Sequence, residues 1–202
     1  MKPVCLVTGV GPGTGAAIVR RFSSEYKVAM IARNEERLAT LELEVASTKA
    51  YPCDVSDSGV LSETINSIRI DLGNPEVVIH NAVGGAFGDF TSITPETLQA
   101  NFRVNTLALL QLGQELVPSM IDRGKGAIVC TGNTSAFRGK ANFAGFAPTK
   151  AAQRILAESM ARHAGPLGVH VAYIAIDAVI SVPWARERFK DQPDDFFCHP
   201  VD

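Results

Sequence analysis

The sequence offers little material for a disulfide framework or a metal centre. Its four histidines are dispersed, and no C-x-x-C pair occurs among its four cysteines, Cys5, Cys53, Cys130 and Cys198. The first three cysteines fall inside or at the ends of apolar, strand-like runs, so we interpret the cysteines as buried, reduced thiols. The sequence therefore predicts no metal site.

Long apolar runs and an excess of one charge are also missing. No apolar run approaches the roughly 18 residues of a membrane span, and the first residues lack the layout of a signal peptide. The 19 basic and 21 acidic residues give a net charge of -2 without a basic stripe. These features argue against nucleic acid and membrane as partners and favour a cytoplasmic protein with one domain over residues 1–202.

A glycine-rich turn dominates the start of the chain. It lies between the apolar run at residues 4–7 and a stretch at residues 16–22 that is apolar at helical spacing. A strand, a glycine turn and a helix in this order can bring backbone N–H groups and the positive end of the helix to a phosphate. The alternative is that the glycines only make a tight turn. The candidate cofactor residues here are Gly9, Gly11, Pro12, Gly13, Thr14 and Gly15.

Six strand patterns alternate with helical patterns along the chain. They cover residues 4–7, 27–32, 49–53, 75–80, 126–131 and 169–176. Alternation of this kind predicts an α/β fold with a doubly wound, Rossmann-like parallel sheet and helices on both faces. Ligands of such sheets lie at the carboxyl ends of the strands, where the glycine turn, Arg33, Asn81, Asn133 and Asp177 would gather.

Polar residues near three strand ends are candidates for cofactor contacts. The end of the second strand carries Arg33 rather than a carboxylate, which favours a 2′-phosphate and hence NADP(H) over NAD(H), although Arg33 could also be a solvated charge. Asp54 could accept a hydrogen bond from an adenine amino group or cap the next helix. Asn81 could join neighbouring strands, while Ala82 leaves room for a ribose.

Asn105 stands among apolar residues of a predicted helix that opens at Thr94-Pro95-Glu96. A buried amide is costly unless its hydrogen bonds are satisfied. Asn105 could satisfy a local kink of this helix or support a water relay.

Together these motifs resemble those of the short-chain dehydrogenase/reductase family over essentially the whole chain. Thr8-Gly9-x-x-x-Gly13-x-Gly15 matches the cofactor loop of that family, and Asp54-Val55, Asn81-Ala82 and Asn105 match further markers. The family's tyrosine-x-x-x-lysine pair falls on Phe146-x-x-x-Lys150. The resemblance implies hydride transfer between a nicotinamide and a carbonyl or alcohol. It also implies that Lys150 holds the nicotinamide ribose and that Asn133, at the serine position, polarises the substrate oxygen.

Three departures from the family pattern affect the expected chemistry. Phe146 has no proton to donate, and Asp177-Ala178 replaces the proline-glycine that follows the sixth strand in the family. The chain also ends at Asp202, about where the family enters another helix and a seventh strand that commonly serve dimer or tetramer contacts. We therefore consider two main hypotheses for the function. The protein is an NADP(H)-dependent oxidoreductase, expected to be a homodimer or tetramer, or it is a catalytically impaired nucleotide-binding subunit or sensor. A structural domain without a ligand is a third.

Overall fold

The computed structural model describes residues 2–200 and contains a parallel sheet of six strands in the order β3-β2-β1-β4-β5-β6. The strands are β1 (Val4–Thr8), β2 (Lys27–Ala32), β3 (Thr48–Pro52), β4 (Pro75–His80), β5 (Gly126–Asn133) and β6 (Val169–Ile176). The predicted doubly wound α/β fold is confirmed. β5 extends two residues further than its apolar run, because it pairs with β6 up to Asn133 and Ile176.

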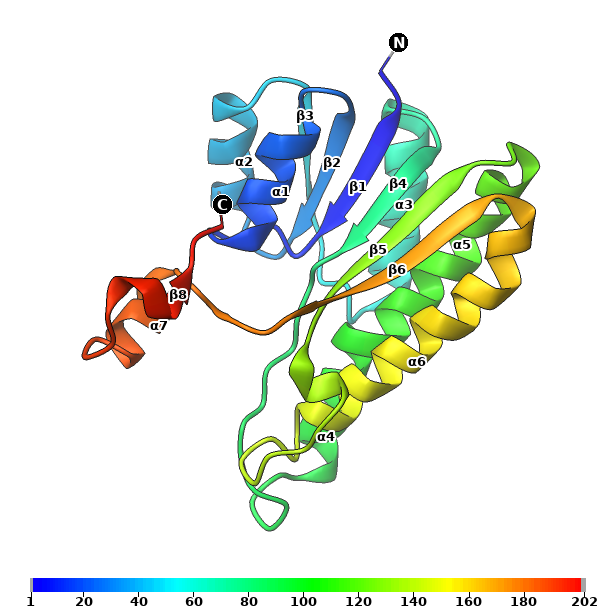
Figure 1. Cartoon of the computed structure of the whole chain (residues 1–202). Coiled ribbons are helices and arrows are strands. Elements are labelled where there is room, and N and C mark those ends of the chain that lie inside the picture. Colours follow the sequence, from blue (N-terminus) through cyan, green and yellow to red (C-terminus); the bar gives the residue numbers. More distant parts are fainter. Residues whose placement is uncertain (1, 201–202) are drawn as a thin grey trace.

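Helices cover both faces of the sheet (Figure 1). α1 (Thr14–Phe22) and α2 (Glu35–Glu44) contribute Val19, Leu38 and Leu41 to the apolar core on one face. α3 (Ser58–Asp71), α5 (Ala108–Asp122) and α6 (Ala147–Ala164) enclose the larger core on the other face. Burying apolar residues on both faces is the reason that the strands are apolar throughout.

The helix expected to continue from Thr94 past Asn105 is divided into three parts. α4 (Pro95–Phe102) is followed by a π-helical turn, η1 (Arg103–Leu107), and then by α5. Such turns interrupt the regular ladder of helical hydrogen bonds and leave backbone groups to be satisfied by other partners. Asn105 lies in this turn, which agrees with the expectation of a local kink at that residue.

The residues after β6 form a small unit of their own, which the sequence pattern did not predict. β7 (Val179–Ile180) pairs with β8 (Phe197–Cys198), with α7 (Pro183–Arg188) between them. A separate apolar cluster formed by Val182, Ala185 and Phe197 stabilises this C-terminal unit (residues 179–200). Within residues 2–200 the main sheet ends at β6, so the described chain adds no seventh strand to it.

Residues 2–200 also contain three short 3₁₀ helices. They are η2 (Thr134–Ala136), η3 (Gly165–Leu167) and η4 (Asp194–Phe196). η2 follows β5 directly and therefore lies at the carboxyl edge of the sheet.

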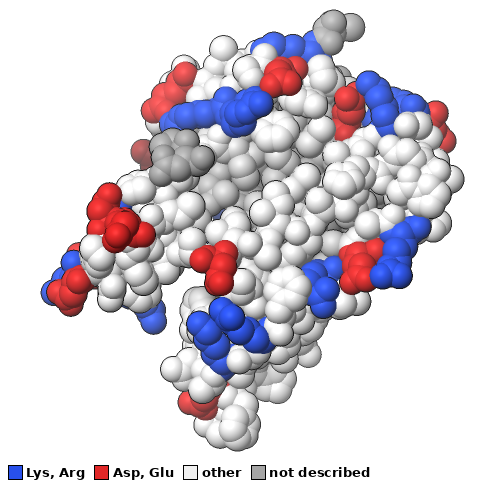
Figure 2. All heavy atoms as spheres, viewed as in Figure 1, with Lys and Arg blue, Asp and Glu red and all other residues white. Residues whose placement is uncertain are grey.

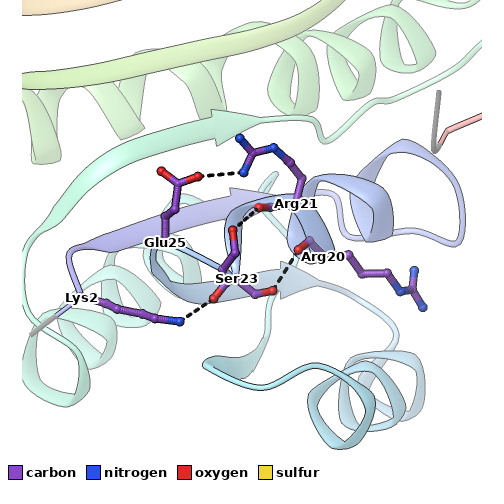
Figure 3. A network of polar contacts seen from close by, with 6 residues as sticks. Lys2, Arg20, Arg21, Ser23 and Glu25 are labelled. Atoms are coloured by element: carbon purple, nitrogen blue, oxygen red, sulfur yellow. Dashed lines mark hydrogen bonds and ion pairs between the residues drawn. The ribbon is translucent and has the colours of Figure 1, made fainter.

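The C-terminal end of α1 is held by a surface network that lies away from the glycine turn (Figure 3). Lys2 Nζ donates to the Ser23 carbonyl at 2.8 Å, and Arg21 pairs with Glu25 at 2.9 Å. These exposed contacts contribute little stability individually.

Charged side chains are mixed on the surface. On the face in Figure 2, basic and acidic residues alternate in small groups, and the middle of that face is mostly uncharged. In the described part of the chain, no helix combines the length and the apolar character needed to cross a bilayer. Cys5, Cys53 and Cys130 are buried free thiols, as expected, whereas Cys198 is exposed on β8.

Candidate functional site

The glycine turn packs directly against the end of β4. Gly9 has φ of 71°, and a Cβ at this position would lie 2.4 Å from the backbone of Ala82. A Cβ on Gly15 would lie 2.5 Å from the Gly9 carbonyl oxygen. Glycine is therefore required here by both backbone conformation and close approach.

The N-terminus of α1 has no side-chain cap. Its N-cap residue is Gly13, and its first turn contains no acidic residue. By contrast, the side chains of Asn34, Asp57 and Thr94 cap α2, α3 and α4. The positive end of α1, at the carboxyl edge of the sheet, thus has no side-chain partner, which suits an anion. Gly13 itself is buried.

Asn81 joins three strands at this edge, as the sequence suggested. Its Nδ2 donates to the Gly9 carbonyl at 2.8 Å, and its Oδ1 accepts from the Thr131 hydroxyl at 2.8 Å. These two bonds connect the ends of β1, β4 and β5. Asn81 thereby holds the glycine turn in a fixed position beside β4.

Asn105 has no exposed surface, and its side chain forms hydrogen bonds at both ends. Its Nδ2 donates to the Gly84 carbonyl at 3.0 Å and to Thr149 Oγ1 at 2.8 Å, while its Oδ1 accepts from Gly84 N. The amide therefore connects the π-helical turn to the loop after β4 and to α6. The hydrogen bonds of this buried amide are thus satisfied, as the sequence required.

Lys150 directs its amine to the end of β5. The residue is 2% exposed, and Nζ donates to the Thr131 carbonyl at 3.2 Å and to Gln153 Oε1. Burial lowers the pKa of Lys150 from 10.5 to about 8, and the Coulomb interaction with Cys130 opposes this shift. A lysine with this pKa still carries its proton in most molecules at pH 7.

Phe146 occupies the position before the first turn of α6 and is buried among aromatic rings. Its ring centroid lies 5.2 Å from that of Phe87 and 6.2 Å from that of Phe143. The backbone N–H of Lys150 donates to the Phe146 carbonyl, so the two residues are one helical turn apart as expected. The ring gives this site an apolar wall.

Asn133 ends β5 and begins η2. Its Oδ1 accepts from Ser135 N at 3.1 Å, and its backbone N–H donates to the Tyr173 hydroxyl at 3.2 Å. Among residues 2–200, Asn133 Nδ2 has no hydrogen-bond partner, which leaves it as a potential donor to a ligand oxygen.

Arg33 and Asp54 lie near each other beyond the ends of β2 and β3. Asp54 Oδ1 accepts from the backbone N–H and hydroxyl of Ser56. Burial alone would raise the pKa of Asp54, but these bonds and the charge of Arg33 lower it below 3.8. The helix-capping interpretation of Asp54 is wrong, because Asp57 caps α3. The Val55 side chain is buried in the core, so only its backbone can face a ligand.

Arg33 is exposed and makes no hydrogen bond or ion pair with other residues in the described range 2–200. A cavity of about 420 Å³ is lined by residues of the glycine turn, α1 and α2. α2 begins two residues after Arg33. Gly11, Pro12, Asn34 and Arg37 are among its lining residues.

A second cavity, of about 380 Å³, lies between the start of α6 and the segment that follows β5. Its lining includes Ser135, Phe143 and Ala147. Asp177, beyond the end of β6, accepts from the Thr134 hydroxyl at 2.7 Å and is 65% exposed at its side chain. The structure thus brings Asp177 to the same segment as Asn133.

The C-terminal unit reaches the glycine turn from the other side. A Cβ on Gly13 would lie 2.6 Å from Val182 Cγ1 and 3.4 Å from Ile180 Cγ2. Thr14 is partly exposed beside it. Any ligand at the start of α1 would therefore lie close to this unit.

The sequence did not identify Thr131, Thr149 and Gln153 as site residues. Their side chains form hydrogen bonds with Asn81, Asn105 and Lys150, respectively. Gln153 has no exposed surface and lies three residues after Lys150 on the buried side of α6. A polar residue at that spacing was the available signal. No three His, Cys, Asp or Glu side chains of the described chain are grouped so that they could hold a metal ion.

Comparisons with known proteins found a matching family model and several relatives. The family model described as short chain dehydrogenase matches residues 3–192. The chain is 28% identical over 154 residues to 2,3-dihydro-2,3-dihydroxybenzoate dehydrogenase of Bacillus subtilis, covering 74% of this chain but only 59% of that relative. It thus spans less than two thirds of that enzyme's length. It is 27% identical over 188 residues to mouse L-xylulose reductase, covering 92% of this chain and 75% of the relative.

A similar solved structure is an NADPH-bound short-chain oxidoreductase from Pseudomonas aeruginosa PAO1 that contains an atypical catalytic center. The two chains are 26% identical, and their structures superpose with a TM-score of 0.83 over 93% of this chain and 76% of the other.

Proposed function

The chain belongs to the short-chain dehydrogenase family of oxidoreductases, and from this membership we propose that it binds NADP(H) and transfers hydride between the nicotinamide and a small carbonyl or alcohol substrate. The observation that carries the proposal is the uncapped start of α1, which shares the carboxyl edge of the sheet with an unpartnered Arg33. An anionic diphosphate and a 2′-phosphate fit these two positive features.

Each candidate residue has a proposed contact with the cofactor. Residues of the glycine turn, Gly9 to Gly15, would hold the diphosphate through backbone N–H groups, and Arg33 would bind the 2′-phosphate. Asp54 would accept from the adenine amino group, next to the backbone of Val55. Asn81 and Ala82 would border a ribose, and Asp177 would lie near the nicotinamide side.

When bound, a reduced nicotinamide would be the source of the hydride for the carbonyl carbon. Lys150 would hold the nicotinamide ribose, and Asn133 Nδ2 would donate to the oxygen as negative charge develops there. Phe146 has no ionisable proton, so the proton that completes the alcohol would come from water or from Lys150. Loss of a positioned acid typically slows such a step by about 10² to 10⁴.

Fluorescence titration with NADPH and NADH tests the cofactor proposal. We expect the unaltered protein to bind NADPH more tightly than NADH. Arg33→Ser should weaken NADPH binding by about 10- to 100-fold, because a charge-assisted hydrogen bond contributes about 1.5–3 kcal/mol, and should change NADH binding by less than about 2-fold. Arg21→Ser, at the other end of α1, is the matched control. Failure of the unaltered protein to bind either nucleotide would overturn the proposal.

A second candidate is a catalytically impaired nucleotide-binding subunit or sensor. The aromatic cluster favours it, because Phe146 fills the position of the proton donor and is only 5% exposed. Such a protein would bind NADP(H) through the same contacts and reduce carbonyl compounds slowly or not at all.

Phe146→Tyr distinguishes the two candidates when NADPH oxidation is measured against a panel of carbonyl compounds. A gain of about 10²-fold or more would indicate that the missing acid limits the protein. Phe143→Tyr adds a hydroxyl elsewhere in the same aromatic cluster and is the control. Rapid turnover by the unaltered protein would exclude the impaired subunit.

We also propose a cytoplasmic homodimer or tetramer. The free thiols of the three buried cysteines suit a reducing compartment. Leu107, Leu110 and Ile155 are exposed on η1, α5 and α6, and exposed apolar side chains of this size favour association. Sedimentation velocity would measure the mass, and a monomer at micromolar concentration would contradict the assembly.

A further inference from the structure

Gln153 links Lys150 to the π-helical turn. Its Nε2 donates to the Asn105 carbonyl at 2.6 Å, and its Oε1 accepts from Lys150 Nζ. The side chain has no exposed surface. Both ends of one amide are therefore used to connect α6 with a backbone carbonyl of η1.

Few other groups surround the Lys150 amine. Within residues 2–200 its acceptors are Gln153 Oε1 and the Thr131 carbonyl. The titratable groups that face it are His80 from β4, Cys130 from β5 and Tyr173 from β6, whose ring centroid lies 6.0 Å from Nζ. None of these is a carboxylate, so Gln153 is the side chain that stabilises the buried ammonium group.

We propose that Gln153 is a positioning residue: its amide links the Lys150 amine to the π-helical turn and keeps this amine charged and oriented for the nicotinamide ribose. Removing the amide leaves the ammonium group with one protein acceptor in a buried site, which favours either loss of its proton or movement of the side chain. The part that concerns the ribose rests on the proposed function, whereas the link itself does not.

The same contacts indicate that Gln153 does not transfer protons. The backbone carbonyl of Asn105 accepts directly from Gln153. An amide N–H keeps its proton in the physiological pH range. Gln153 therefore orients Lys150 without passing protons to it.

Three variants test this role. Gln153→Met keeps a similar side-chain length and removes both hydrogen bonds, whereas Gln153→Glu places a carboxylate beside the amine. Gln114→Met changes an exposed glutamine of α5 and is the control. The ¹³Cε resonance of Lys150, identified by its absence in Lys150→Met, reports protonation of the amine in the cofactor-free protein.

We expect the titration midpoint of Lys150 to fall by roughly one to two pH units in Gln153→Met, equivalent to one charge-assisted hydrogen bond. In Gln153→Glu it should rise by about one unit or more. Gln114→Met should leave it unchanged. If Gln153→Met does not fold, the direction of the shift in Gln153→Glu decides, and an unchanged midpoint in either folded Gln153 variant overturns the proposal.

NADPH titrations of the same variants connect the link to the cofactor. Gln153→Met should weaken NADPH binding at pH 7 by about 10-fold. As the pH rises, the affinity of this variant should decrease around the new titration midpoint of Lys150. Equal affinity and equal pH dependence in Gln153→Met and the unaltered protein would overturn the ribose part. Absence of binding by the unaltered protein would instead refute the proposed function, while the resonance shift still tests the link.

Discussion

Single polar side chains connect the elements around the carboxyl edge of this sheet. Asn81, Asn105 and Gln153 each use both ends of an amide, and His80 uses both ring nitrogens. His80 Nε2 lies 3.2 Å from the Val104 carbonyl, which can only accept, so this nitrogen carries the proton. His80 Nδ1 then accepts from the Thr8 hydroxyl at 3.0 Å. A neutral imidazole therefore joins β1, β4 and η1.

This histidine predicts a loss of stability in mild acid. Burial lowers the pKa of His80 from 6.5 to about 4, with a smaller contribution from the charge of Lys150. The unfolded chain binds a proton at this residue below pH 6.5, but the folded protein does not until about pH 4. Stability should therefore fall as the pH decreases through this window, by about 3 kcal/mol in total.

Urea unfolding of the unaltered protein and His80→Gln between pH 7 and pH 4 measures this effect. The difference between their free energies of unfolding should change with pH, because glutamine does not titrate. His163→Gln, at the exposed end of α6, is the control. A difference that is constant with pH would show that His80 titrates alike in the folded and unfolded states.

Two irregular elements determine the shape of the site. The glycine turn allows β1, β4 and α1 to approach closely, and the π-helical turn presents Asn105 to the loop after β4. Both are departures from regular geometry that long-range contacts hold in place. Such departures often occur at functional sites.

The glycine turn predicts different losses of stability for two alanine substitutions. Gly9→Ala adds a Cβ at positive φ and 2.4 Å from the Ala82 backbone, so we expect a loss of about 2–4 kcal/mol. Gly11→Ala meets no atom within 4 Å and should change stability by less than about 0.5 kcal/mol. Thermal and urea denaturation measure both, and equal stabilities would show that the turn relaxes at little cost.

The whole molecule consists of the sheet domain and the C-terminal unit, which meet at the glycine turn. The C-terminal unit has its own apolar cluster and an Arg186–Asp194 ion pair at 2.6 Å. Figure 2 shows a notch between this unit and the lobe that contains α4. Movement of the unit would change access to the start of α1.

We therefore expect NADPH binding to alter backbone hydrogen exchange in residues 179–200. The Ser181 N–H, which donates to the Cys198 carbonyl at 2.8 Å, is a reporter within the unit. Val182→Ser should weaken the contact with Gly13 and raise exchange in this unit, whereas Val60→Ser on exposed α3 should not. Unchanged exchange at saturating NADPH would mean that the unit does not respond to the cofactor.

The amino-acid sequence by itself determined the six strands, the helices that alternate with them and the glycine turn, because these depend on local periodicity and on the backbone freedom of glycine. It also placed Asn81, Asn133 and Asp177 at one edge, since the ends of parallel strands lie together. The family resemblance was readable from the same motifs.

Only the tertiary structure decided which polar groups pair and how the chain continues after β6. Gln153 and Asn105 are 48 residues apart in the sequence and meet only when α6 packs beside η1. Asp57, rather than Asp54, caps α3, because the helix begins at Ser58, and the Asp54 carboxylate bonds to Ser56 instead. The elements of the C-terminal unit are too short to show a period, and packing among its few apolar side chains forms them.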